Sequence, residues 1–222
     1  MKTNLNSIQR LLVMGVCFIN ITLVNAQNGN WKITSAGMAG QGGTYTGSVA
    51  ISAQGSVHQL SWKTSGGNYT GVGLMQGSKL YAGYGVNIDY GVVVYQLMAD
   101  GSLNGTWATN KTGGDIGTEK VVGGKALNGT YQISGKNAGS GASAYTGTLT
   151  IKKTGSVYAC QWKTGNVTYD GVGLLDGNMF VVGWGFGNAF GVVMYDVKGS
   201  TAQGTWAMGG GTQLGTENLA KN

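Results

Sequence analysis

The chain contains the same segment twice, and this repeat limits the fold more than any other feature. Residues 69–95 read YTGVGLMQGSKLYAGYGVNIDYGVVVY and residues 169–195 read YDGVGLLDGNMFVVGWGFGNAFGVVMY, with matching positions 100 residues apart. The match continues on both sides, because Trp62 corresponds to Trp162 and later Gly-Thr-Trp and Gly-Thr-Glu motifs also recur. Two copies of one sequence should fold as two copies of one structure.

The hydrophobic pattern within each copy predicts antiparallel β-strands. Apolar Val49 and Ile51 alternate with polar Ser48 and Ser52, and this period of two is typical of a strand with one buried face. Turn signals such as Gln-Gly and Gly-Gly-Asn divide each copy into about eight short strands. Such strands remove their exposed edges most simply by closing into an up-and-down barrel.

The predicted fold is therefore all-β, with two tandem small antiparallel up-and-down β-barrels of about eight short strands each. A single barrel shared by the two copies and a pair of sandwiches are the alternatives. The expected domains are a β-barrel repeat over residues 27–122, a linker over residues 123–127 and a second β-barrel repeat over residues 128–222.

Residues 1–26 have the layout of a cleaved secretory signal peptide. Basic Lys2 and Arg10 precede an apolar run that ends in small residues at Ala26. An uncleaved membrane anchor is the alternative, but the apolar run is short for a bilayer span. We expect cleavage near Ala26, a secreted, periplasmic or cell-surface protein, and no membrane span in the mature chain.

Composition argues against nucleic acid as a specific partner, against disorder, and against stabilisation by a disulfide. Arg10 is the only arginine, so the mature chain has no guanidinium group to read base edges or clamp phosphates, and no specific nucleic-acid partner is expected. The 43 glycines are interleaved with aromatic and branched residues, which indicates a glycine-rich but ordered fold. Because Cys160 is the only cysteine after the signal peptide, no intrachain disulfide can form.

No constellation of residues indicates an enzyme. The single histidine, His58, has Tyr158 as its counterpart, which favours a packing role over that of a base or metal ligand. Cys160 replaces Leu60 on an apolar strand face and has no neighbouring histidine to activate it. We therefore expect a non-enzymatic protein with no catalytic residue, no metal site and no cofactor.

Glu119 and Glu217 are the only acidic positions that recur in both copies. They share a strand face with Val121 and Leu219 respectively, so their carboxylates should point towards one barrel end. A structural role is favoured, in which each carboxylate binds backbone amides or a lysine and closes the last strand. The alternative is a charged group at the floor of a ligand cavity.

The segment between the fifth and sixth strands of each copy is the predicted binding site. Residues 84–90 and 184–190 are unusually aromatic for a turn, and exposed rings offer stacking area to a sugar or a protein. The alternative is that these rings plug the barrel end. Large aromatic side chains such as Trp31 and Trp62 should fill so narrow an interior and leave no cavity. The candidate ligand-binding residues are Tyr84, Tyr90, Trp184, Phe186 and Phe190.

The ordered motifs Y-T-G, Y-x-G-V-G-L, G-V-V-x-Y, G-T-W and G-T-E resemble a repeat of secreted bacterial proteins, some of which are labelled fibronectin-binding protein. This resemblance covers nearly the whole mature chain twice and implies an adhesin of the extracellular matrix. The Gly29-Asn30-Trp31 start is also similar to the GxW opening of calycin barrels (lipocalin and avidin-like), although those barrels commonly pack an arginine near this tryptophan.

The sequence thus predicts a secreted binding protein, an adhesin for extracellular protein or glycan. A calycin-like carrier of a small ligand, or an enzyme-inhibitor barrel, is the alternative. A measured cavity of ligand size would reverse that order.

Overall fold

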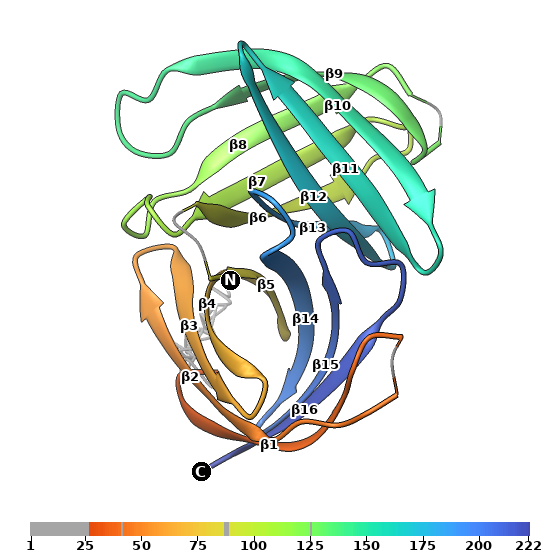
Figure 1. Cartoon of the computed structure of the whole chain (residues 1–222). Coiled ribbons are helices and arrows are strands. Elements are labelled where there is room, and N and C mark those ends of the chain that lie inside the picture. Colours follow the sequence, from red (N-terminus) through yellow and green to blue (C-terminus); the bar gives the residue numbers. More distant parts are fainter. Residues whose placement is uncertain (1–26, 41, 87–88, 125) are drawn as a thin grey trace, which may run out of the picture.

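The structure is a computed structural model that describes residues 27–40, 42–86, 89–124 and 126–222. Its regular secondary structure consists of sixteen β-strands, which form two closed antiparallel barrels of eight strands each (Figure 1). The predicted fold class is confirmed. The predicted signal peptide, residues 1–26, lies outside the described residues.

One barrel is formed by a continuous stretch in the middle of the chain and is called the central barrel. Its strands are β6 (Tyr90–Leu97), β7 (Leu103–Thr109), β8 (Gly117–Val122), β9 (Gly129–Lys136), β10 (Ala144–Thr154), β11 (Val157–Thr164), β12 (Val167–Asp176) and β13 (Met179–Gly185).

The other barrel contains both ends of the described chain and is called the terminal barrel. Its strands are β1 (Gly29–Gly37), β2 (Gly47–Gln54), β3 (Val57–Thr64), β4 (Gly67–Gln76), β5 (Lys79–Gly85), β14 (Phe190–Lys198), β15 (Thr201–Met208) and β16 (Gly215–Lys221).

The two sequence copies exchange their last three strands. β5 pairs with β14 of the second copy, and β13 pairs with β6 of the first copy. In Figure 1 the blue strands β14 to β16 complete the lower barrel beside the orange strands, and the olive to yellow-green strands β6 to β8 belong to the upper barrel. The expectation that residues 27–122 and 128–222 each close their own barrel is therefore wrong.

The physical reason is the repeat itself. β6 and β14 carry nearly the same sequence, so either strand offers β5 the same pattern of apolar side chains and backbone groups. Exchange of equivalent elements between repeats replaces one set of strand pairs by a matching set, which makes the exchange energetically inexpensive. The expected linker, residues 123–127, follows β8 and precedes β9, which are paired neighbours within the central barrel.

Two short crossovers carry the chain between the barrels. Residues 86–89 connect β5 to β6, and residues 186–189 connect β13 to β14. The start of the first crossover meets the end of the second, because the backbone N–H of Val86 donates a hydrogen bond to the carbonyl oxygen of Ala189 at 3.2 Å. Both predicted binding loops thus contain the segments that connect one barrel to the other.

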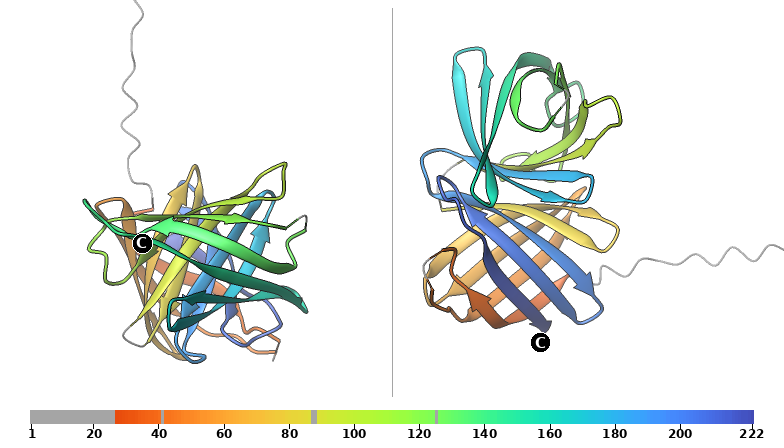
Figure 2. Two further views of the ribbon diagram at one scale, coloured as in Figure 1. Left: turned by 90° about the horizontal axis from the view of Figure 1, so that it is seen from above. Right: turned by 90° about the vertical axis from the view of Figure 1, so that its right-hand side faces the viewer.

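The barrels are stacked on each other (Figure 2) and share an apolar interface. Val72, Val92, Val172 and Val192 are buried in one cluster with other side chains from the outer faces of the strands around the junction. This interface explains why the G-V-V-x-Y motif is apolar at successive positions: β6 is buried on both faces for most of its length.

Glycines bring the two backbones together at this interface. A Cβ atom added to Gly83 of β5 would lie 2.0 Å from the carbonyl oxygen of Gly91 in β6. The equivalent atom on Gly183 would lie 2.1 Å from the carbonyl oxygen of Gly191. The absence of a side chain at both positions therefore sets how closely the barrels approach.

Candidate functional site

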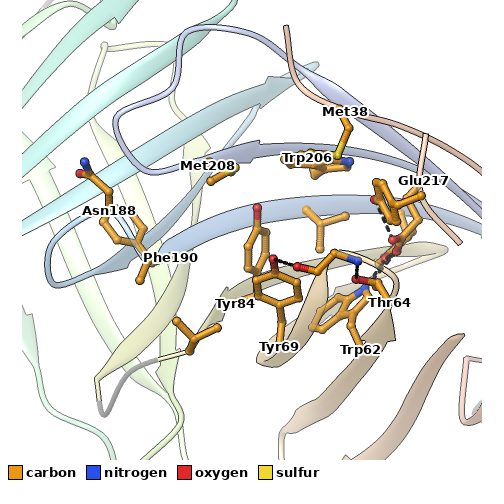
Figure 3. Close-up of a pocket in the computed structure, with 16 residues that line it drawn as sticks. Met38, Trp62, Thr64, Tyr69, Tyr84, Asn188, Phe190, Trp206, Met208 and Glu217 are labelled. Atoms are coloured by element: carbon orange, nitrogen blue, oxygen red, sulfur yellow. Dashed lines mark hydrogen bonds between the residues drawn. The ribbon is translucent and has the colours of Figure 1, made fainter. Parts of the chain in front are cut away.

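Each barrel is hollow at one end, and matching residues line the two cavities. The cavity of the terminal barrel has a volume of about 160 Å³, and that of the central barrel about 490 Å³. Figure 3 shows the aromatic walls of the first, with Glu217 at one side and the crossover residue Asn188 at the other. The aromatic wall residues are Tyr45, Trp62, Tyr69, Tyr84 and Trp206 in the terminal barrel, and Tyr145, Trp162, Tyr169, Trp184 and Trp107 in the central barrel.

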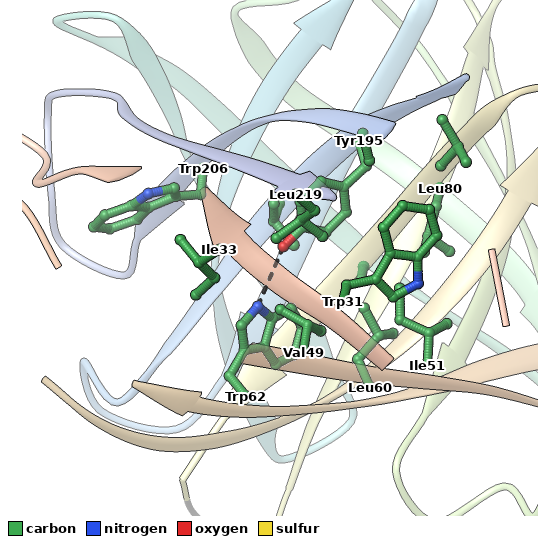
Figure 4. Close-up of a cluster of buried hydrophobic side chains, with 14 of the residues drawn as sticks. Trp31, Ile33, Val49, Ile51, Leu60, Trp62, Leu80, Tyr195, Trp206 and Leu219 are labelled. Carbon is green, nitrogen blue, oxygen red and sulfur yellow. Dashed lines mark hydrogen bonds between the residues drawn. The ribbon is translucent and has the colours of Figure 1, made fainter. Parts of the chain in front are cut away.

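The opposite half of the terminal barrel is filled. Trp31 is fully buried there among aliphatic side chains such as Ile51 and Leu80, and its indole N–H donates to the backbone oxygen of Gln27 at 2.7 Å. Figure 4 shows Trp62 between this core and Trp206. The expectation that aromatic side chains fill the whole interior is therefore wrong.

A buried glutamate accepts three side-chain hydrogen bonds in the terminal pocket. Oε1 of Glu217 accepts from the indole N–H of Trp62 at 3.0 Å and from the hydroxyl of Tyr195. Oε2 accepts from the hydroxyl of Tyr45 at 2.9 Å. Glu217 is 3% exposed, and it is placed by β16, beside β15 and β1.

The central pocket repeats this arrangement atom for atom. Oε1 of Glu119 accepts from the indole N–H of Trp162 at 3.1 Å and from the hydroxyl of Tyr95, and Oε2 accepts from the hydroxyl of Tyr145 at 3.0 Å. In both pockets the donors are two tyrosines and a tryptophan instead of the expected backbone amides or lysine. Both glutamates also line the cavities, as in the less favoured of the two predictions for them.

Burial shifts the pKa values of Glu119 and of the fully buried tyrosine donors. Burial raises the pKa of the Glu119 carboxyl, while its hydrogen bonds from Tyr95, Trp162 and Tyr145 act in the opposite direction. Burial, followed by the charge of the neighbouring glutamate, raises the pKa values of Tyr95 and Tyr195 well above 10.0. The tyrosines therefore remain hydroxyl donors at physiological pH.

Strand exchange makes each pocket a composite of both sequence copies. In the terminal barrel, Trp62 and Tyr69 come from the first copy, whereas Tyr195 and Glu217 come from the second. In the central barrel the contributions are reversed, because Glu119 comes from the first copy and its donor Trp162 from the second. The two copies must therefore pair with each other before either glutamate can accept a hydrogen bond from its tryptophan.

Glycines make room for the aromatic walls. A Cβ on Gly71 would lie 2.7 Å from the ring of Trp62, and one on Gly91 would lie 2.7 Å from the ring of Trp184. Both rings therefore lie across a neighbouring strand, where the glycine leaves room for them.

The five predicted ligand-binding residues fall into different environments. Tyr84 and Phe190 line the terminal pocket, and Trp184 lines the central pocket. Tyr90 is buried in the interface between the barrels, whereas Phe186 lies in a crossover and is 44% exposed. The aromatic segments thus contribute to both pockets without forming one site.

Sequence reasoning missed most of the wall residues, because it assigned them to a filled interior. Trp62 and Trp162, for example, recur in equivalent positions and are the direct partners of the recurring glutamates. The signal that could have identified these pockets is a tryptophan and a glutamate that both recur in the two copies.

The pockets differ at their rims. Met208 lines the terminal pocket and pairs with Gly191, whereas its counterpart Thr109 lines the central pocket and pairs with Gly91. Phe190 also reaches the terminal pocket. The terminal cavity is consequently smaller and more apolar, and the central cavity has a polar rim that includes Asn137 and Thr146.

His58 and Cys160 lie away from both pockets. His58 is buried, its ring contacts the side chain of Gln27, and burial lowers its pKa below 6.5. Cys160 is buried in the core of the central barrel, where burial raises the pKa of its thiol.

Two further features are absent from the part of the chain that the structure describes. Within it, no three or more His, Cys, Asp or Glu side chains gather as a metal site would require. That part also contains no helix with the length and apolar character needed to cross a membrane.

Comparison with protein-family models, with curated proteins and with solved structures finds no match to this chain.

Proposed function

We propose that this chain is an exported, non-enzymatic protein that binds a small organic ligand in the pocket of each barrel. One observation carries the proposal: the same aromatic walls and the same buried glutamate surround a cavity in both barrels. The central cavity, at about 490 Å³, lies within the range of roughly 300–1,000 Å³ that ligand pockets occupy.

Packing energetics support a binding role for these cavities. An unfilled cavity reduces stability, because its lining atoms lose contacts with neighbours. The closed half of the terminal barrel shows that this sequence can fill a barrel interior with Trp31 and aliphatic side chains. A pocket kept open at the equivalent end of both barrels is better explained by an occupant than by poor packing.

A second candidate function, adhesion to an extracellular protein or glycan, is favoured by exposed apolar side chains near the crossovers. Val86 is 54% exposed and Phe186 is 44% exposed. Met208, at the rim of the terminal pocket, is also exposed. A partner that uses this surface should lose affinity on Phe186→Ser, whereas a ligand in the terminal pocket, which Phe186 does not line, should be little affected.

The test is a fluorescence titration with 1-aminoanthracene, a neutral probe whose emission rises in apolar surroundings. We expect saturable binding, with the central barrel as the stronger site because its cavity is larger. Thr109→Met, which gives the central pocket the side chain of its counterpart, should weaken the stronger site. Met208→Thr is the reciprocal control and should strengthen the weaker one. Absence of saturable binding, or binding that neither substitution alters, would contradict the proposal.

A further inference from the structure

We infer that the pockets select small organic cations, with an ammonium group placed on the buried glutamate and the rest of the ligand against the aromatic walls. This inference rests on the proposed function and narrows its ligand class. It follows from three features of the pockets: an acceptor position left on each carboxylate, the lack of a countercharge in the lining, and the aromatic rings that line the same cavity.

The first feature is the unused acceptor capacity of the glutamates. A carboxylate offers about four lone-pair positions. In the central pocket, Oε1 of Glu119 accepts two hydrogen bonds, whereas Oε2 accepts only the one from Tyr145 among the described residues. The same count holds for Glu217, whose Oε2 accepts only from Tyr45 within the described part of the chain. Each pocket thus presents one carboxylate oxygen that can accept a hydrogen bond from a ligand.

The second feature is that the charge of each buried glutamate has no opposite charge beside it in the pocket lining. Of the described residues that line the two pockets, none is lysine or arginine, and the glutamate is the only acidic side chain. Glu119 is 6% exposed and Glu217 is 3% exposed, so each carboxylate is removed from water without an opposite charge in the lining. A buried charge is destabilising unless it is paired. An ammonium ligand would supply the missing charge and the missing hydrogen bond together.

The third feature is the orientation of the rings. In the central pocket the rings of Tyr169 and Trp184 are 5.3 Å apart and inclined by 73°, so the two form a corner. In the terminal pocket Tyr69 and Tyr84 form a similar corner at 5.9 Å and 77°. Aromatic faces attract cations through their quadrupole, and desolvation strengthens this attraction.

The central barrel is the better site for a ligand that contains a ring. Its cavity is about three times the volume of the terminal one, which Met208 and Phe190 narrow. The terminal pocket should accept only smaller cations, such as a methylated ammonium ion. Selectivity for charge should therefore be common to both barrels, and selectivity for size should differ.

The test is a calorimetric comparison of three probes of matched shape: 2-phenylethylamine, 2-phenylethanol and 3-phenylpropanoate. We expect the amine to bind about tenfold or more tightly than the alcohol, and the acid to bind weakest. Glu119→Gln removes the charge, because its amide oxygen takes the hydrogen bonds from Trp162 and Tyr95 and its NH₂ group replaces the free acceptor Oε2. It should weaken binding of the amine about tenfold and change binding of the alcohol by less than about twofold.

The outcomes separate this inference from the proposed function. If the alcohol binds as tightly as the amine, or if Glu119→Gln weakens both equally, the cation inference is overturned and the pocket remains a ligand site. If 1-aminoanthracene binds but none of the three probes does, the cation inference is likewise overturned and the pocket remains a ligand site. If neither 1-aminoanthracene nor any of the three probes binds, the proposed function and the inference fail together. The probe series on the unaltered protein decides the question even if Glu119→Gln does not fold.

Discussion

Gly83→Ala is expected to lower the melting temperature by about 6–12 °C, corresponding to about 3 kcal/mol of lost stability for a protein of this size. The added Cβ would lie 2.0 Å from the carbonyl oxygen of Gly91, so β5 and β6 must separate. Because the obstacle is backbone, no change of side-chain rotamer relieves it. Gly183→Ala should have the same effect, since its Cβ would meet Gly191 at 2.1 Å. Differential scanning calorimetry measures both.

Gly66→Ala is the matched control for these substitutions. Its φ angle is not positive, and the nearest atom to an added Cβ is the hydroxyl oxygen of Thr64 at 3.7 Å. The control should change stability by less than about 0.5 kcal/mol. If Gly83→Ala proved as mild as Gly66→Ala, the close approach of the two barrel backbones would be wrong.

Glu217→Leu is expected to reduce the free energy of unfolding by about 3–4 kcal/mol. The substitution leaves the hydroxyls of Tyr45 and Tyr195 without their acceptor. The indole N–H of Trp62 keeps only its second acceptor, the hydroxyl oxygen of Tyr195 at 3.2 Å. Each buried donor left unpaired costs about 1–3 kcal/mol, and water entering through the pocket recovers part of this. Glu119→Leu should have a similar effect on the central barrel. Urea unfolding of each variant gives the measurement.

Glu217→Gln is the control for Glu217→Leu, because glutamine keeps the shape of glutamate and most of its hydrogen bonds. Its amide oxygen can accept from Trp62 and Tyr195, and its NH₂ group can donate to the hydroxyl of Tyr45 if that hydroxyl rotates. The expected loss is about 1 kcal/mol. Equal stability of the leucine and glutamine variants would show that these hydrogen bonds contribute little to the fold.

The sequence predicts the fold class because a hydrophobic period of two, frequent turn signals and the need to remove sheet edges all favour closed barrels. It does not predict which strands close which barrel. β6 and β14 share the G-V-V-x-Y motif, so local pairing preferences are the same for β5 with either partner. The glycine contacts at Gly83 and Gly183 join strands of different barrels, so they form only once both barrels are assembled and cannot be seen in the sequence of one strand.

The candidate site is predicted in part for a related reason. Tyr84, Phe190 and Trp184 are found from the aromatic character of their segments, and all three line a pocket. The pockets themselves are not predicted, because the alternation of strand residues shows which side chains face the interior and not how far they fill it. Whether Trp62 fills or lines the barrel depends on Gly71, which lets the ring lie flat across the adjacent strand.

The most direct test of the composite pockets is a pair of disulfide traps in a Cys160→Ala background. Lys79 and Asp196 are directly opposed in the β5–β14 ladder, at a separation that suits a disulfide. If each copy closed its own barrel, Lys79 would instead oppose Gln96, the counterpart of Asp196. The monomer should therefore form a disulfide in Lys79→Cys/Asp196→Cys and none in Lys79→Cys/Gln96→Cys, as read by peptide mass mapping. A disulfide in the second variant and none in the first would contradict the strand exchange and the composite pockets built on it.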